Sequence, residues 1–171
     1  MIKIVFHPDS DQEDYSEIIG EYEQIWKDKG QRIINTIEKY GGMKFKEKTI
    51  NAVVYFGSLP SRSRPLSLRA NVPTKIRLGI LVHELCHRIL AGNKVKIKFN
   101  DDENASLEVH KVLDLILYDI WTELYGKKFA NKVKEWESNS WLDIYKKAWE
   151  WALSFDKTTR ALKFKKLAKI K

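Results

Sequence analysis

The chain lacks the features that mark secreted and membrane proteins. Cys86 is its one cysteine in 171 residues, which leaves no internal pair for a disulfide and agrees with a reducing compartment. No apolar stretch is long enough to span a bilayer, because charged residues interrupt the most hydrophobic region, Val109 to Trp121. The first apolar stretch is too short for a secretory signal, since Pro8 and Asp9 follow it at once. We therefore expect a soluble, cytoplasmic protein without a membrane span.

The composition predicts one domain with a basic end. A chain of 171 residues with 43% hydrophobic content can form the core of one domain and is too short for two of comfortable size. The net charge is +8, and much of it lies in the last segment. We expect a domain over residues 1–157 and a basic tail over residues 158–171. Such a tail could contact nucleic acid or another anionic partner, and the plainer alternative is a solvated or loosely docked terminal helix.

The pattern of apolar residues predicts an α+β chain. Alternating or β-branched stretches indicate strands at residues 1–7, 49–56 and 66–70. Helical spacing of apolar residues predicts helices over residues 15–40, 74–91, about 100–125, 127–137 and 142–155. A small sheet followed by a largely helical second half is therefore expected.

The main candidates for metal binding and catalysis lie in one short segment, HELCH, at residues 83–87. Residues four apart lie on the same face of a helix, so His83 and His87 can direct both imidazoles at one cation. Glu84 stands beside them, where a carboxylate can take a proton from a metal-bound water instead of binding the metal. Such short patterns also arise by chance, so the surrounding residues decide how much weight this one carries.

The helix that contains this segment is apolar on nearly all sides, which predicts that it is buried. Two histidines and a glutamate in a core are costly unless something compensates, and a zinc ion does so. The alternative is a set of core polar groups satisfied without a metal. Cys86 points away from the histidine face and is expected to be a small core residue. Gly79, one turn before His83, leaves room either for substrate or for close helix packing.

These residues resemble the active-site motif of the zincin metallopeptidases. The shared features are His83-Glu84-x-x-His87 on a buried helix, a possible edge strand before it and another helix after it, over roughly residues 50–125. The resemblance implies a zincin-like α+β fold: a small mixed sheet, the active-site helix, a second ligand-bearing helix and a helical C-terminal region. It also implies a Zn²⁺ cofactor and peptide-bond hydrolysis with Glu84 as general base. Residue 93 is Asn, which departs from the third-histidine pattern of the metzincins.

The third zinc ligand is expected on the next helix, because a catalytic zinc usually has three protein ligands and one open position. The candidates are Glu103, Glu108 and His110. Thermolysin-like gluzincins use a Glu at the spacing of Glu108, but Val112 stands where that family has a supporting Asp. On a helical wheel His110 borders the apolar stripe, Asp114 follows one turn later, and Glu108 lies nearly opposite. We therefore favour His110 as ligand and Asp114 as acceptor for a ligand histidine's N–H, with Glu108 as the alternative.

Substrate contacts are harder to assign from the sequence. The zincin resemblance implies that an extended peptide pairs with an edge strand, for which Leu66 to Ala70 is the candidate; an ordinary short strand is the alternative. Tyr118, Tyr125 and Arg69 are candidates for stabilising the oxyanion, and each has an equally plain structural interpretation. A later aromatic stripe, which includes Tyr145, has helical spacing and predicts packing against the domain.

Three functions fit these patterns. The first is a cytoplasmic zinc metallopeptidase that acts on a peptide or protein substrate. The second is a DNA-associated or regulatory protease of SprT-like or ImmA-like type, recruited by the basic tail. The third is a non-catalytic module whose motif holds a structural metal or none. The sequence leaves the substrate and the oligomeric state open.

Overall fold

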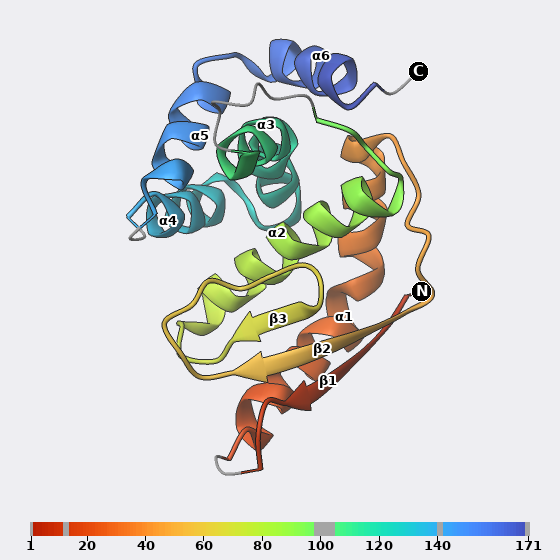
Figure 1. Ribbon diagram of the computed structural model, residues 1–171, viewed down its shortest axis with the longest axis vertical. Coiled ribbons are helices and arrows are strands. Elements are labelled where there is room, and N and C mark those ends of the chain that lie inside the picture. Colours follow the sequence, from red (N-terminus) through yellow and green to blue (C-terminus); the bar gives the residue numbers. More distant parts are fainter. Residues whose placement is uncertain (1, 12–13, 98–104, 140–141, 170–171) are drawn as a thin grey trace.

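The computed structural model describes residues 2–11, 14–97, 105–139 and 142–169, which form a small sheet and six helices (Figure 1). None of the helices within these ranges combines the length and the apolar character needed to cross a bilayer. The elements follow one another in the order β1 (Lys3–Pro8), α1 (Ser16–Gly41), β2 (Thr49–Tyr55), β3 (Leu66–Arg69), α2 (Thr74–Gly92), α3 (Ala105–Tyr125), α4 (Lys127–Ser138), α5 (Asp143–Leu153) and α6 (Lys157–Ala168).

The three strands of the sheet are parallel and lie in the order β1-β2-β3. One row across the sheet joins Phe6, Ala52 and Leu66. The expected mixed sheet is therefore corrected: among the described residues, antiparallel pairing is limited to an isolated bridge between Arg62 and Ser67. The reason is that α1 and the segment after β2 each return the chain to the same end of the sheet before the next strand begins.

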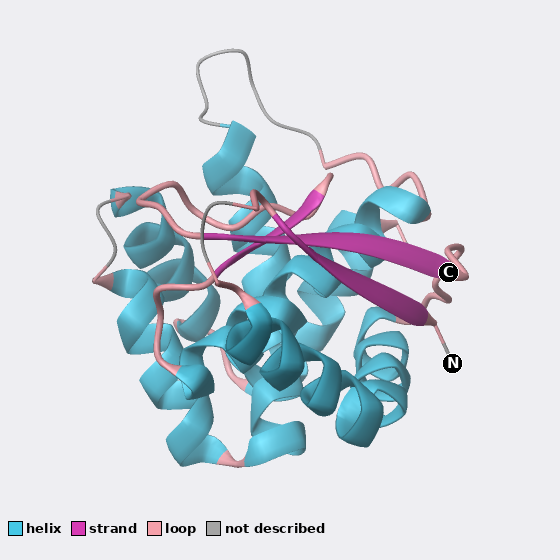
Figure 2. Ribbon diagram, turned by 90° about the horizontal axis from the view of Figure 1, so that it is seen from below, coloured by secondary structure: helices cyan, strands magenta, loops and turns pink. Residues whose placement is uncertain are grey.

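One face of the sheet is buried. Its inward side chains are Ile4, Phe6, Ile50, Ala52, Val54, Leu66 and Leu68. The intervening positions are partly or fully exposed, as alternation along a strand requires. Most of the helical part of the molecule lies on one side of the sheet (Figure 2). Tyr22 of α1 stacks on Phe6 of β1 with ring centroids 5.4 Å apart, which fixes α1 against the buried face.

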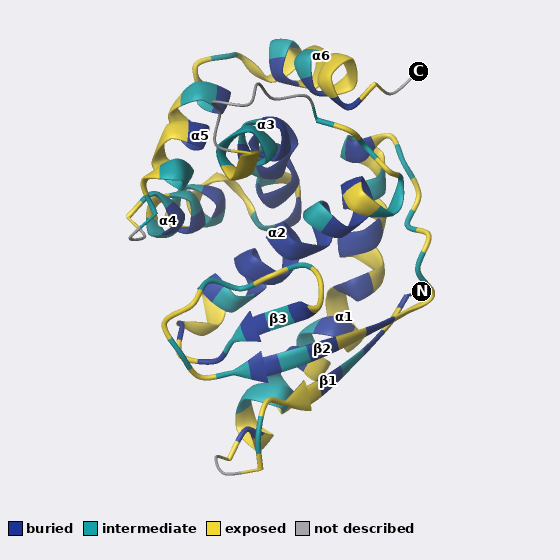
Figure 3. Ribbon diagram, in the orientation of Figure 1, coloured by how far each residue is buried: buried dark blue, intermediate teal, exposed yellow. Residues whose placement is uncertain are grey.

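Helix α2 connects the sheet to the rest of the helical part. It contacts α1, β3, α3 and α4 and is buried along most of its length, as the sequence predicted (Figure 3). A Cβ atom on Gly79 would lie 2.5 Å from a methyl carbon of Val133 in α4. The glycine at this position thus allows close packing of α2 on α4, which decides between the two roles predicted for it.

Helix α6 packs onto the domain and is not a free tail. The guanidinium of Arg160 donates hydrogen bonds to the carboxylate of Asp119 in α3 at 2.8–3.3 Å, and both side chains are buried. Phe164 is 1% exposed and belongs to the same core cluster as α2 and α3. Much of the predicted basic segment, residues 158–171, therefore lies in a docked helix, while a domain boundary at residue 157 stays a prediction.

Candidate metal centre

Three histidines from two helices converge on one point. His83 and His87 come from successive turns of α2, and His110 comes from α3. Their candidate ligand nitrogens lie within 4.8 Å of one another, and the Nε2 atoms of His83 and His87 are 3.0 Å apart. Ligand nitrogens of a tetrahedral zinc stand about 3.3 Å apart, given Zn–N distances of about 2.0 Å. The cluster can therefore hold a metal ion after small adjustments of the rings.

The orientation of His110 is fixed by its own helix. Its Nδ1 donates a hydrogen bond to the carbonyl oxygen of Ser106, 2.7 Å away and one turn earlier. A carbonyl can only accept, so Nδ1 carries the proton and Nε2 offers a lone pair. Burial, together with the nearby His83, lowers the pKa of His110 to about 4, which keeps the imidazole neutral and able to bind a metal.

The rival ligand Glu108 does not reach the cluster. It forms an ion pair with Lys111 on the same helix, and among the described residues it is absent from the group that could hold a metal. Of these two candidates, His110 therefore lies close to the other histidines and Glu108 does not. The side of α3 that Glu108 shares is not all exposed, since Leu115 and Asp119 are buried. Glu103, the remaining candidate, lies outside the described residues.

Glu137 of α4 contacts the histidine cluster and is not among the residues predicted from the sequence. Its Oε1 lies 2.9 Å from Nδ1 of His83, and its Oε2 accepts a hydrogen bond of 3.0 Å from Nε1 of Trp149 in α5. Glu137 is 5% exposed, although it is an acid. A signal did exist: Glu137 shares the buried face of α4 with Ala130 and Val133 at helical spacing. A carboxylate on that face requires a partner inside the domain.

Asp114 does not fill the role predicted for it. It is completely buried, as its place on the wheel implied, but neither carboxylate oxygen has a hydrogen-bond partner among the described residues. The Nδ1 atom of His83 is bonded to Glu137 and that of His110 to Ser106, so neither ring donates to Asp114. Burial raises the pKa of Asp114 well above its usual range, and the charge of Glu137 raises it further.

The acids next to the cluster shape its electrostatics. Burial by itself would lower the pKa of His83, but the adjoining Glu137 carboxylate outweighs it and raises the value to about 9. Burial raises the pKa of Glu84 to about 7; the charge of His83 opposes this effect and that of Glu137 adds to it. The pKa of His87 is lowered well below its usual value by burial and by the two other histidines. A metal ion would replace the proton on His83 and compensate the buried negative charge.

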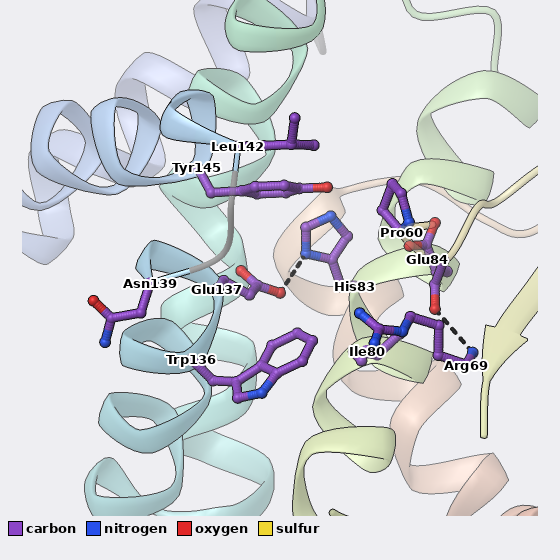
Figure 4. A pocket seen from close by; sticks show the side chains of 11 residues that line it. Pro60, Arg69, Ile80, His83, Glu84, Trp136, Glu137, Asn139, Leu142 and Tyr145 are labelled. Carbon is purple, nitrogen blue, oxygen red and sulfur yellow. Dashed lines mark hydrogen bonds and ion pairs between the residues drawn. The ribbon is translucent and has the colours of Figure 1, made fainter. Parts of the chain in front are cut away.

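A cavity of about 370 Å³ opens beside His83 and Glu84 (Figure 4). It is lined by Pro60, Ser61, Arg69, Ile80, His83, Glu84, Trp136, Glu137, Asn139, Leu142 and Tyr145. One histidine of the cluster, His83, and the candidate base Glu84 therefore both line an open space. The size is at the lower end of the roughly 300–1,000 Å³ found for ligand pockets.

The structure revises the candidates for oxyanion stabilisation. Tyr118 and Tyr125 do not line the cavity, and the hydroxyl of Tyr118 donates to Oδ1 of Asn131 at 2.7 Å. Arg69 does line it. Tyr145, which the sequence analysis assigned to packing, also lines it, and its ring centroid lies 4.7 Å from that of His110. In Figure 4 its side chain extends from α5 above the His83 ring. A hydroxyl donor therefore stands next to the cluster.

The outer edge of β3 is already occupied by the preceding loop. The backbone N–H and carbonyl of Ser67 pair with those of Arg62 at 2.8 and 3.0 Å, and the N–H of Arg69 donates to Oγ of Ser61 at 3.1 Å. These are groups to which an added strand would have to bind. The prediction that a peptide pairs with residues 66–70 is thus wrong for this arrangement of the chain.

In comparisons with known proteins, no family model, curated protein or solved structure matches the chain. The structure itself establishes an α+β fold with a small parallel sheet and a largely helical remainder. It also establishes three histidines close enough to bind one metal ion. The resemblance to zincins stays a prediction that depends on the motif.

Proposed function

We propose that this chain is a zinc-dependent metallopeptidase in which His83, His87 and His110 hold the metal and Glu84 is the general base. The observation that supports this most is the convergence of three imidazoles beside a buried carboxylate, at the edge of a cavity. A structural metal site is usually closed by four protein ligands, whereas a catalytic zinc site keeps one position open. Three histidines, of which His83 lines the cavity, match the second arrangement.

The ligand set favours zinc. Imidazole nitrogen suits zinc, copper, iron and nickel, and three neutral histidines with one vacant position are typical of hydrolytic zinc. Two of the three histidines have their second nitrogen bonded to an acceptor, Glu137 for His83 and the Ser106 carbonyl for His110. Such partners fix the ring orientation and increase the basicity of the ligating nitrogen.

Glu84 has the position and the pKa for proton transfer. Bound zinc would supply Lewis-acid polarisation of the attacking water and the scissile carbonyl. Glu84 accepts one proton from the water as its oxygen attacks the carbonyl carbon, and delivers that proton to the amine as the C–N bond breaks. Burial raises the pKa of Glu84 above that of an ordinary carboxylate, which is the direction that favours acceptance of a proton. We assign the hydroxyl of Tyr145, which lines the cavity, as the donor to the oxyanion.

The test compares the zinc-loaded wild-type chain with the variant Glu84→Gln on a mixture of short peptides, with products identified by mass spectrometry. The variant should retain zinc but lose hydrolysis, since an amide cannot accept the proton. Glu150→Gln, an exposed position on α5, is the matched control and should behave as wild type. Hydrolysis that persists in Glu84→Gln contradicts the assignment of the base. Zinc binding without any hydrolysis by the wild type favours a non-catalytic metal-binding module instead.

A further inference from the structure

Arg69 is the one arginine or lysine among the described residues that line the cavity beside the histidine cluster. The remaining lining is apolar at Pro60, Ile80, Trp136 and Leu142, and it is acidic at the end where His83 lies. Figure 4 shows the Arg69 side chain extending from β3 into this space, toward the side on which Trp136 lies. A guanidinium among apolar walls is a strong recognition element, because little water competes for it.

Arg69 has no carboxylate partner within the described part of the chain. Its Nε donates a long hydrogen bond of 3.4 Å to Oδ1 of Asn71, and no ion pair joins it to an acid there. Three other arginines are each paired with an acid, in the pairs Arg77–Glu21, Arg88–Glu47 and Arg160–Asp119. Arg69 is partly buried, and among the described residues its charge has no acidic partner. A carboxylate that accepts from both terminal nitrogens would satisfy it.

The occupied edge of β3, next to Arg69, also limits how a substrate can bind. The loop at residues 61–62 occupies the outer edge of β3, so an extended polypeptide cannot add there as a further strand. A substrate must instead enter the cavity of about 370 Å³, a volume that suits a short peptide. Short peptides always carry a terminal carboxylate, and some carry acidic side chains as well.

We propose that Arg69 binds a carboxylate of the substrate close to the scissile bond, so that the substrate class is short peptides with a negatively charged group; this inference rests on the proposed peptidase function. Arg69 is then the residue that determines specificity. The carboxylate comes either from the peptide C-terminus or from an Asp or Glu side chain. Both sources offer the same two oxygen atoms to the guanidinium.

The experiment measures binding by calorimetry with the zinc-loaded Glu84→Gln chain, so that no peptide is consumed. Four N-acetylated tripeptides serve as probes: each combines a C-terminal acid or amide with a central Glu or Gln. We expect peptides with the recognised carboxylate to bind about 10-fold or more tightly than their neutral counterparts. Adding Arg69→Gln should remove this preference. Adding Arg62→Gln, an exposed arginine of the preceding loop, should leave it intact.

Each outcome has a definite meaning. A preference for acid over amide assigns the terminal carboxylate, and a preference for Glu over Gln assigns the side chain; either supports the role of Arg69. Equal binding of the four probes, no binding of any, or a preference that survives Arg69→Gln overturns it. Thermal unfolding of each variant shows whether the fold is kept. Arg69→Lys keeps the positive charge but not the paired N–H donors of the guanidinium, so this variant should retain part of the preference. Absence of hydrolysis by the wild type would overturn the peptidase proposal and leave the binding result as it stands.

Discussion

The Nδ1 atom of His83 and Oε1 of Glu137 lie 2.9 Å apart and join α2 to α4 inside the domain. The same carboxylate accepts the indole N–H of Trp149, so α5 is attached to this pair as well. The Nε2 atom of His83 consequently faces His87, 3.0 Å away, where a metal ligand is needed. Glu137 is therefore a positioning residue for the candidate metal centre, although it lies 54 residues from His83 in the sequence.

Replacing Glu137 by Gln should weaken zinc binding by about 10-fold to 100-fold, because the amide keeps the shape but loses the charge that orients and polarises His83. Competition with a chromogenic chelator measures the affinity. Glu135→Gln, at an exposed position of the same helix, is the matched control and should bind zinc as the wild type does. Equal affinities of the two variants would show that the buried pair does not support the metal.

The two rival ligands on α3 can be separated by substitution. His110→Ala should lower the zinc affinity by about 100-fold or more, since it removes one of three ligands. Glu108→Ala should change the affinity by less than about threefold, because its carboxylate is paired with Lys111 and lies outside the cluster. The same chelator competition applies to both. A larger loss in Glu108→Ala than in His110→Ala would reverse the assignment.

Tyr145→Phe tests the hydroxyl beside the cluster. The variant should retain its zinc affinity and hydrolyse peptides about 100-fold more slowly, the order of effect seen when one oxyanion donor is removed. Tyr118→Phe is the control, because the hydroxyl of Tyr118 bonds to Asn131 and does not line the cavity. Steady-state hydrolysis rates of the two variants are compared. An unchanged rate in Tyr145→Phe would contradict the role of this hydroxyl as the oxyanion donor.

Gly79→Ala tests the packing of α2 on α4. The added Cβ would meet the methyl carbons of Val133 at 2.5 and 2.7 Å, so the helices must separate, at a cost of about 1–3 kcal/mol in the free energy of unfolding. Gly20→Ala is the opposite case: no atom lies within 4 Å of its Cβ, and removal of a helical glycine should stabilise the chain by about 0.5–1 kcal/mol. Denaturant unfolding of both variants provides the comparison. A neutral or stabilising effect of Gly79→Ala would contradict the close contact.

What the sequence predicts well in this chain is local. His83 and His87 are related by one helical turn, and the all-round apolar character of their helix predicts its burial. His110 could be chosen over Glu108 because it borders the apolar stripe of α3, although residues on the other side of this helix are buried too. These predictions require only the spacing of apolar residues along one helix and no information about the helix that packs against it.

What the sequence does not predict depends on contacts between distant segments. Glu137 and Tyr145 reach the site only because α4 and α5 pack beside α2 and α3. The occupied edge of β3 depends on a short pairing of Ser67 with Arg62, in a loop that has no periodic pattern. Asp114 is buried but has no hydrogen-bond partner among the described residues, because Glu137 of α4 occupies the Nδ1 atom of His83 and the sequence of α3 gives no sign of this.

The most direct test of the central claim is the zinc content and zinc-dependent stability of the purified wild-type chain. One zinc ion per chain is predicted, measured by elemental analysis after dialysis. Removal of the metal by a chelator should lower the unfolding temperature, and zinc at about 100 times its dissociation constant should restore about 2.7 kcal/mol of stability. A chain that contains no zinc after exposure to it, and whose unfolding temperature does not respond to added zinc, would contradict a metal centre at His83, His87 and His110.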